Sequence, residues 1–227
     1  MINKSIVSKN KTIFFFTMSL IVVGGMLIAL TSRKELHLFF NGFVSTNANS
    51  FFIYSTYLGD GYFIIGCLLM LLFYNFRIFL AGISAYSFSS LLVQILKNLI
   101  FPEAERPRVY FENVAKDTKL ILIDGIETLG LHSFPSGHTT AAFSLMITFA
   151  LIQKNPLVKT IFMFIAVLVG ISRIYLSQHF FEDVYTGMII GTLFAYLSVY
   201  YFYFTKTSSK YERLEVSVFN LYKKKVE

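Results

Sequence analysis

Three short clusters of polar residues interrupt a mostly apolar sequence, and their residue types are those that bind and transfer phosphate. The first cluster holds Lys97 and Arg106-Pro107, the second reads Pro135-Ser136-Gly137-His138, and the third contains Arg173, His179 and Asp183. Lysine and arginine neutralise phosphate oxygens, and histidine can act as a nucleophile or as a proton carrier. The clusters therefore predict phosphoryl-transfer chemistry.

His179 and Asp183 are four residues apart, so on a helix they share one face. A carboxylate in that position accepts a hydrogen bond from one ring nitrogen and fixes the tautomer of the histidine. The other ring nitrogen then becomes a better nucleophile or base. This spacing predicts that His179 reacts and that Asp183 orients it.

An anion site is predicted beside this pair. Pro135 suits the first turn of a helix, Ser136 can cap it, and Gly137 lets a ligand approach the main chain. Helix N-termini favour anions, and the cations Lys97, Arg106 and Arg173 add positive charge. Each residue has an ordinary structural alternative, such as a lysine snorkelling to the interface or a histidine bonded locally at a helix start. Their conjunction at one membrane face favours a site.

The stretches "PSGH" and "SR-x5-H-x3-D", following a lysine and an Arg-Pro pair, resemble the signature of the type 2 phosphatidic acid phosphatase/vanadium haloperoxidase superfamily. The second and third motifs match in full. The first departs, because eight residues separate Lys97 from Arg106 where the family usually has six, and Pro102 lies in the interval. Arg108 is therefore a weak rival to Arg106.

The resemblance implies a mechanism. His179 would attack phosphorus to form a phosphohistidine, and Asp183 would orient it. His138 would protonate the leaving oxygen and then activate water. The phosphate oxygens would be held by Lys97, Arg106, Arg173, Ser136 and Gly137. No metal and no cofactor is expected, since side-chain cations take the phosphate-binding role.

The elements that must position these residues are membrane helices. The chain has 227 residues, 55% of them hydrophobic, with a mean hydropathy of +0.61. Apolar runs that approach the roughly 20 residues of a membrane span occupy Ile13–Leu30, Gly61–Phe76, Ile78–Leu96, Thr139–Gln153, Thr160–Ser172 and Val184–Thr205. We expect an all-α integral membrane protein with six transmembrane helices, forming one membrane domain over residues 1–227 with its motif region at 97–183.

The distribution of charge predicts the topology. The net charge is +7, and basic residues gather in the segments that are cytoplasmic if the N-terminus is inside. Both termini are then cytoplasmic, and the three clusters face the periplasm or the exterior across the cell (inner) membrane. On that outer side, Thr31–Asp60 is expected to be a loop with an interfacial helix, and Phe101–Phe134 to cap the surface. A basic tail beside a membrane helix is a topology signal or contacts lipid headgroups, so no nucleic-acid partner is expected.

The predicted function is that of an integral membrane lipid phosphatase acting at the outer leaflet on a phosphomonoester or a diphosphate. A phospholipid, an isoprenyl diphosphate and the phosphates of lipid A are the candidate substrates. The alternative is a lipid phosphotransferase, which would use the same phosphohistidine. Haloperoxidases with a similar pocket are soluble, so six apolar runs argue against that activity. A transporter or scaffold would leave the three clusters unused.

Overall fold

A computed structural model describes residues 4–205, 209–212 and 214. These residues form helices and loops, and no β-strand occurs among them. The predicted all-α fold class is thereby confirmed. Most of the predicted basic tail, including Lys206, Arg213 and Lys223–Lys225, lies outside the described residues.

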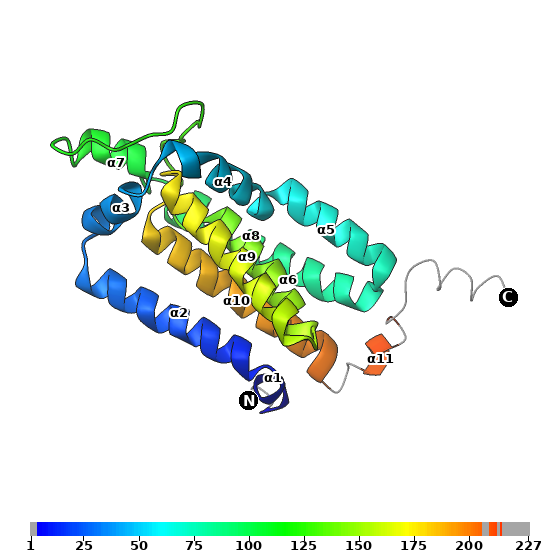
Figure 1. The fold of residues 1–227 in the computed structure, drawn as a ribbon. Helices are drawn as coiled ribbons and strands as arrows, with labels where there is room; N and C mark the ends of the chain where they lie inside the picture. The colour runs from blue at the N-terminus through cyan, green and yellow to red at the C-terminus, as the bar shows by residue number, and fades with distance from the viewer. Residues whose placement is uncertain (1–3, 206–208, 213, 215–227) are drawn as a thin grey trace.

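The helices run as follows in chain order (Figure 1): α1 Lys4–Lys9, α2 Lys11–Leu30, α3 Arg33–Asn41, α4 Thr46–Thr56, the 3₁₀ turn η1 Tyr57–Gly59, α5 Gly61–Tyr74, α6 Phe76–Ile95, the π-helical turn η2 Leu96–Ile100, α7 Pro107–Asn113, α8 Gly137–Ile152, α9 Pro156–Tyr175, α10 Phe181–Phe204 and α11 Ser209–Glu212.

Each of the six predicted apolar runs coincides with a helix over most of its length, but the count of six membrane spans is not confirmed. Within the described residues, four helices are long and apolar enough to cross a membrane: α2, α6 with η2, α9 and α10. The segments Thr46–Gly59 and Gly61–Tyr74 qualify only together, as one pair bent by 53°. Helix α8 has 16 residues, which is short of the roughly 20 that a span needs. The absence of charge from a run of residues does not show whether the helix it forms is long enough to span a membrane.

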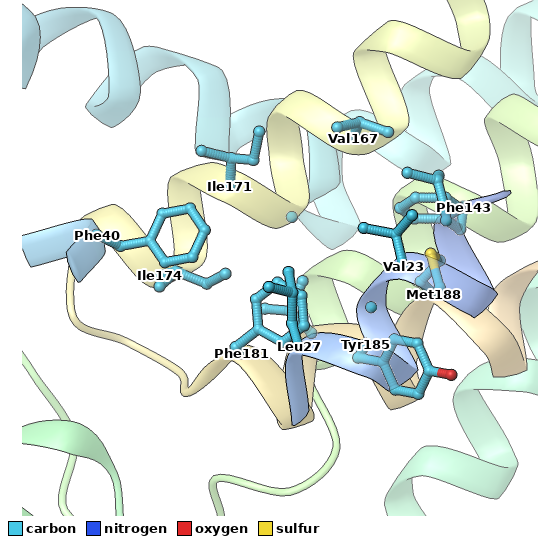
Figure 2. A pocket seen from close by; sticks show the side chains of 14 residues that line it. Val23, Leu27, Phe40, Phe143, Val167, Ile171, Ile174, Phe181, Tyr185 and Met188 are labelled. Atoms are coloured by element: carbon cyan, nitrogen blue, oxygen red, sulfur yellow. The ribbon is translucent and has the colours of Figure 1, made fainter. Parts of the chain in front are cut away.

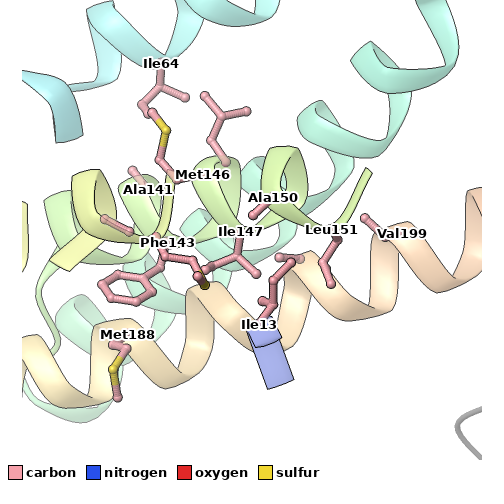
Figure 3. Packing of buried hydrophobic residues seen from close by; sticks show 14 of the residues in the cluster. Ile13, Ile64, Ala141, Phe143, Met146, Ile147, Ala150, Leu151, Met188 and Val199 are labelled. Atoms are coloured by element: carbon pink, nitrogen blue, oxygen red, sulfur yellow. The ribbon is translucent and has the colours of Figure 1, made fainter. Parts of the chain in front are cut away.

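Helix α8 lies at the centre of the bundle and packs against α6, α9 and α10. Its side chains are buried on every face, as Phe143, Ile147 and Ala150 illustrate in Figure 3. A helix that is apolar all round belongs to a core or to a membrane. The first turn of α8, which carries the end of the PSGH motif, therefore continues directly into a buried helix.

A close contact joins α10 to α8 through two glycines. A Cβ atom on Gly187 would lie 2.7 Å from the carbonyl oxygen of Ser136, and one on Gly191 would lie 2.6 Å from that of Thr140. Only glycine permits such an approach of two backbones. The pair thus fixes α10 against the beginning of α8.

The segments predicted to lie outside the membrane gather at one end of the bundle (Figure 1). Thr31–Asp60 contains two helices, α3 and α4, and Phe101–Phe134 contains α7. Helix α3 begins with a capping box between Ser32 and Glu35. At its end, Asn41 exchanges two hydrogen bonds with the backbone of Ile121, of 2.8 and 2.9 Å. The placement of a helix in the membrane interface stays a prediction.

An apolar groove of about 220 Å³ lies between α2 and the α9–α10 pair (Figure 2). Tyr185 spans it, and its hydroxyl donates to the carbonyl oxygen of Ile21 at 2.9 Å. Its described lining includes no carboxylate, histidine or cation. None of the predicted site residues lines this groove.

Candidate active site

The structure brings the three predicted clusters together at the end of the bundle where α8 begins. The first cluster follows α6, and the third occupies the tight connection between α9 and α10. His179 lies within electrostatic range of the other predicted histidine, His138, and of the three predicted cations Lys97, Arg106 and Arg173.

His179 and Asp183 form the buried centre of this cluster. His179 Nδ1 lies 3.4 Å from Asp183 Oδ2, and their side chains are 2% and 0% exposed. The same carboxylate oxygen accepts from Ser133 Oγ at 2.5 Å and from the backbone N–H of Phe180 at 2.9 Å. Asp183 is thereby fixed by two donors, and it fixes the imidazole in turn.

The surroundings of His179 favour its neutral form. Burial lowers the pKa of this imidazole well below 6.5, and Arg106 and Arg173 lower the pKa further. With Nδ1 directed at Asp183, the ring nitrogen that remains is Nε2. Within the described residues, Nε2 has no hydrogen-bond partner. The geometry leaves a neutral ring nitrogen for attack on an electrophile.

The interval between Lys97 and Arg106, with its unusual spacing, begins in a π-helical turn and continues as a loop. Lys97 lies in η2, where the N–H of Phe101 donates to the carbonyl oxygen of Leu96 across five residues. Such turns insert extra residues into a helix and recur at functional sites. Lys97 Nζ lies 2.6 Å from the carbonyl oxygen of His132 and 3.5 Å from that of Ser133, beside the start of α8.

Arg106, rather than Arg108, belongs to the cluster. Arg106 is 6% exposed and donates to the carbonyl oxygens of Leu131 and Gln178, at 3.1 and 3.0 Å. Burial lowers its pKa. Arg108 is half exposed and pairs with Glu112 one turn along α7. The spacing of the motif left both arginines as candidates, and the burial of Arg106 favours it over Arg108.

Arg173 approaches the cluster from the end of α9. Its Nη1 donates to Thr56 Oγ1 at 2.7 Å, and its Nη2 contacts Gln178 Oε1 at 3.5 Å. Its Nε is buried without a partner among the described residues. A buried unpaired donor is costly, and an anion oxygen would satisfy it.

The start of α8 has the predicted form of an anion cradle. Ser136 caps the helix, and its Oγ accepts from the Thr139 hydroxyl at 2.9 Å. Its own N–H donates to the carbonyl oxygen of Asp183 at 2.9 Å, which joins the second cluster to the third. A Cβ on Gly137 would meet nothing within 4 Å, so open space lies in front of the helix N-terminus.

His138 stands at the edge of this space. Two cavities include it in their lining: one of about 160 Å³ beside Gly137 and Gln94, and one of about 210 Å³ beside Asp60 and Arg173. Its Nε2 lies 3.7 Å from Asp60 Oδ2. Both side chains are about one-third exposed, 34% and 33%, so the pair faces the cavity rather than the core.

Sequence reasoning missed four residues that contact the site: Thr56, Asp60, Ser133 and Gln178. Ser133 and Gln178 adjoin the motifs, so their position in the sequence was a signal. Thr56 and Asp60 lie far upstream, and nothing in the sequence connects them to the clusters.

His37 is a further polar residue, and it is fully buried against Ser177 and Phe180. Burial lowers the pKa of His37 to about 4, so it is a neutral packing residue.

Possible metal ligands were compared with the residues of the site. Within the part of the chain that the structure describes, no group of three or more His, Cys, Asp or Glu side chains could hold a metal ion. The cations of the site are side chains, and the two histidines have nitrogen atoms directed at carboxylates.

The fold and the site define a class: a helical membrane protein whose buried histidine faces cations and a helix N-terminus, an arrangement suited to a tetrahedral anion. The chain matches the PAP2 superfamily over residues 78–207. That range is more than half of the sequence and contains every predicted site residue. The protein belongs to the PAP2 superfamily, as its motifs indicated.

Two curated proteins are similar to parts of the chain. Phosphatidylglycerophosphatase B of Bacillus subtilis (strain 168) is 40% identical over 74 residues, which cover 29% of this chain and 36% of that protein. Probable lipid phosphate phosphatase 4 of Arabidopsis thaliana is 28% identical over 147 residues, covering 54% of this chain and 48% of that protein. The chain thus spans less than half the length of either relative.

Two solved structures share the fold. LpxE of Aquifex aeolicus aligns with a TM-score of 0.64 and 29% identity, covering 73% of this chain and 93% of LpxE. A transmembrane PAP2-type phosphatidylglycerolphosphate phosphatase from Bacillus subtilis aligns with a TM-score of 0.60 and 24% identity, covering 85% of this chain and 95% of that one. The second likeness is evidence of fold alone.

Proposed function

We propose that this protein is an integral membrane lipid phosphatase that hydrolyses a phosphomonoester or a diphosphate through a phosphohistidine. The observation that carries the proposal is the buried His179–Asp183 pair, which faces three cations and the start of α8. Membership of the PAP2 superfamily supports it, as does the similarity to proteins named as lipid phosphatases.

The proposed reaction has two steps. In the first, His179 Nε2 forms a bond to phosphorus while the bond to the leaving oxygen breaks, and His138 gives that oxygen a proton. In the second, His138 takes a proton from water as the water oxygen bonds to phosphorus, and the bond from phosphorus to His179 Nε2 breaks, which releases phosphate and restores neutral His179. Lys97, Arg106 and Arg173 stabilise the charge on the phosphoryl oxygens as it shifts in each transition state.

The substrate is proposed to be a lipid phosphate in the outer leaflet. Two kinds of observation support an active site on the outer face of the membrane: the distribution of basic residues in the sequence and the arrangement of the helix ends. Lys9 lies over the ring of Phe204 at 5.6 Å, so α1 and the end of α10 share one end of the bundle. The site lies at the opposite end, where α10 begins (Figure 1). A cytoplasmic N-terminus then gives an outward site.

Purified protein should release free phosphate from at least one lipid in a panel of phosphatidic acid, phosphatidylglycerol phosphate, an isoprenyl diphosphate and lipid A. One phosphate per substrate consumed indicates hydrolysis, and a deficit indicates transfer to another acceptor. Brief incubation with a ³²P-labelled substrate should label the protein at an acid-labile, base-stable site.

The variant His179→Ala should lose that label. His132→Asn is the matched control, because the His132 side chain is exposed and asparagine tolerates its positive φ of 55°. The His132 Nδ1 lies 3.2 Å from the carbonyl oxygen of Lys97, and the asparagine amide offers a donor in its place. Lys97 contacts the backbone carbonyl of residue 132, which this substitution retains. Persistent labelling of His179→Ala, or no turnover of any lipid by the wild type, would contradict the proposal.

A further inference from the structure

Asp60 reaches the site from outside the matched family region, which begins at residue 78. It stands between η1 and α5, and its two carboxylate oxygens have different partners. Oδ1 accepts from the backbone N–H of Tyr62 at 2.8 Å and so caps α5. Oδ2 lies 3.7 Å from Nε2 of His138. The cap fixes the carboxylate while leaving one oxygen directed at the imidazole.

The segment that carries Asp60 is docked firmly against the site. A Cβ on Gly59 would lie 2.5 Å from Val169 Cγ1 and 2.7 Å from the carbonyl oxygen of His138. Three residues before Gly59, Thr56 accepts the hydrogen bond from Arg173 Nη1. Residues 56–60 therefore contact both α8 and α9 at the site, and the distance from Asp60 to His138 is set by backbone packing.

Besides Asp60, three cations act on His138, and Glu127 lines the same cavity. Lys97, Arg106 and Arg173 lie within electrostatic range, and His179 is the neighbouring titratable ring. Like charges disfavour a protonated imidazole, and an opposite charge favours it. A general acid must nevertheless carry its proton when the leaving group departs. Burial and the three cations favour neutral His138, the wrong state for that role, and Asp60 acts in the opposite direction.

We propose that Asp60 is the positioning residue for His138, orienting the ring and favouring its protonated form. The inference rests on the proposed function. With Nε2–H directed at Asp60, Nδ1 is the atom that gives its proton to the leaving oxygen as the bond from His179 Nε2 to phosphorus forms. Neutral His138 then has its lone pair on Nδ1, ready to take a proton from the attacking water. The arrangement parallels that of Asp183 and His179, with the two ring nitrogens exchanged.

The test removes the charge and keeps the helix cap. Asparagine and serine are both good N-cap residues, so Asp60→Asn and Asp60→Ser retain the start of α5. Asp117→Asn is the matched control, because Asp117 is exposed on the loop after α7. Rapid-quench bursts of enzyme phosphorylation are measured with p-nitrophenyl phosphate and with the lipid that the wild type cleaves fastest.

The rate of the burst with the lipid should fall by about 10- to 100-fold. This is less than the full rate contribution of a general acid, because His138 itself is still present. The nitrophenyl burst should change by less than about threefold, because nitrophenolate leaves without a proton. In the pH–rate profile of the burst with the lipid, the alkaline limb should move to lower pH, because His138 loses its proton more readily when the Asp60 carboxylate is gone. The longer variant Asp60→Glu should recover part of the lipid burst.

Equal losses with the two substrates in both variants, or bursts equal to those of Asp117→Asn, would overturn the inference. So would an alkaline limb that does not move. These results differ from a failure of the proposed function, in which the wild type itself forms no phosphoenzyme. A fall in thermal midpoint with an unchanged ratio of the two burst rates would identify Asp60 as a helix cap alone.

Discussion

Replacing Gly187 with alanine should impair the site without replacing any of the predicted site residues. Gly187 lies in α10, and its Cα faces the carbonyl oxygen of Ser136, the cap of α8. The added Cβ would lie 2.7 Å from that oxygen and 3.0 Å from Thr140 Oγ1. Ordinary contact begins near 3.4 Å, so the two helices must separate locally by about 0.7 Å.

That displacement acts on the phosphate cradle, because Ser136 also donates its N–H to the carbonyl oxygen of Asp183. Overpacking of this kind costs about 1–3 kcal/mol of stability. A misplacement near 1 Å at a reacting centre costs about 100-fold in rate. We expect kcat to fall by about 10- to 100-fold, more than the loss of stability alone would produce.

Two glycines serve as controls in measurements of kcat and of the thermal midpoint in detergent. Gly66→Ala adds a Cβ with nothing within 4 Å, and alanine is the better helix former, so stability and rate should be kept. Gly191→Ala clashes with α8 at Thr140 and Phe143, deeper in the bundle. It should lower stability comparably and reduce kcat less. A Gly187→Ala enzyme as active as Gly66→Ala would refute the argument.

The remaining predictions concern mechanism and topology. His138→Ala should slow the phosphorylation burst far more with phosphatidic acid than with p-nitrophenyl phosphate, whereas His179→Ala should abolish both; equal losses for His138→Ala would remove it from the role of acid. Because burial and neighbouring cations lower the pKa of His179, its neutral form should persist as pH falls, so the acid limb of kcat/KM should lie below pH 6.5; a limb above that value would count against His179 as nucleophile. EDTA should leave activity unchanged and vanadate should inhibit; activity lost to EDTA and restored by Mg²⁺ would show a metal-dependent reaction. With Cys67 replaced by alanine, an impermeant thiol reagent should label a cysteine at Lys116 and spare one at Lys154 in intact cells; the reverse pattern would invert the topology.

The His179–Asp183 pairing was predictable from sequence, although for a partly mistaken reason. The prediction placed both residues on one helical face, but α10 begins only at Phe181, so His179 lies in the preceding turn. The two side chains meet because Asp183 folds back to accept the N–H of Phe180. A carboxylate at the third helical position commonly reaches back to the cap in this way. The same four-residue spacing serves either geometry.

The contacts of Thr56 and Asp60 could not be predicted, because they depend on how α4, η1 and α5 dock against α8 and α9. Gly59 makes that approach possible, but a glycine in a polar loop more commonly serves a turn. The number of membrane spans was similarly ambiguous in the sequence. The hydropathy of the sequence located α8. The helix nevertheless has only 16 residues, which is short for a membrane span, and most of its side chains are buried among neighbouring helices. Burial of that kind is a tertiary property.

The spacing between Arg173 and His179 has a physical cause in the backbone. Helix α9 ends in a tight turn in which the N–H groups of Gln178 and His179 both donate to the carbonyl oxygen of Arg173, at 3.0 and 3.2 Å. Ser177 adopts a φ of 51° to close this turn. Gln178 then bonds Arg106 through its backbone oxygen and contacts Arg173 through its side chain. One residue added or removed would turn His179 away from both guanidinium groups, so the backbone of this turn enforces the spacing of the motif.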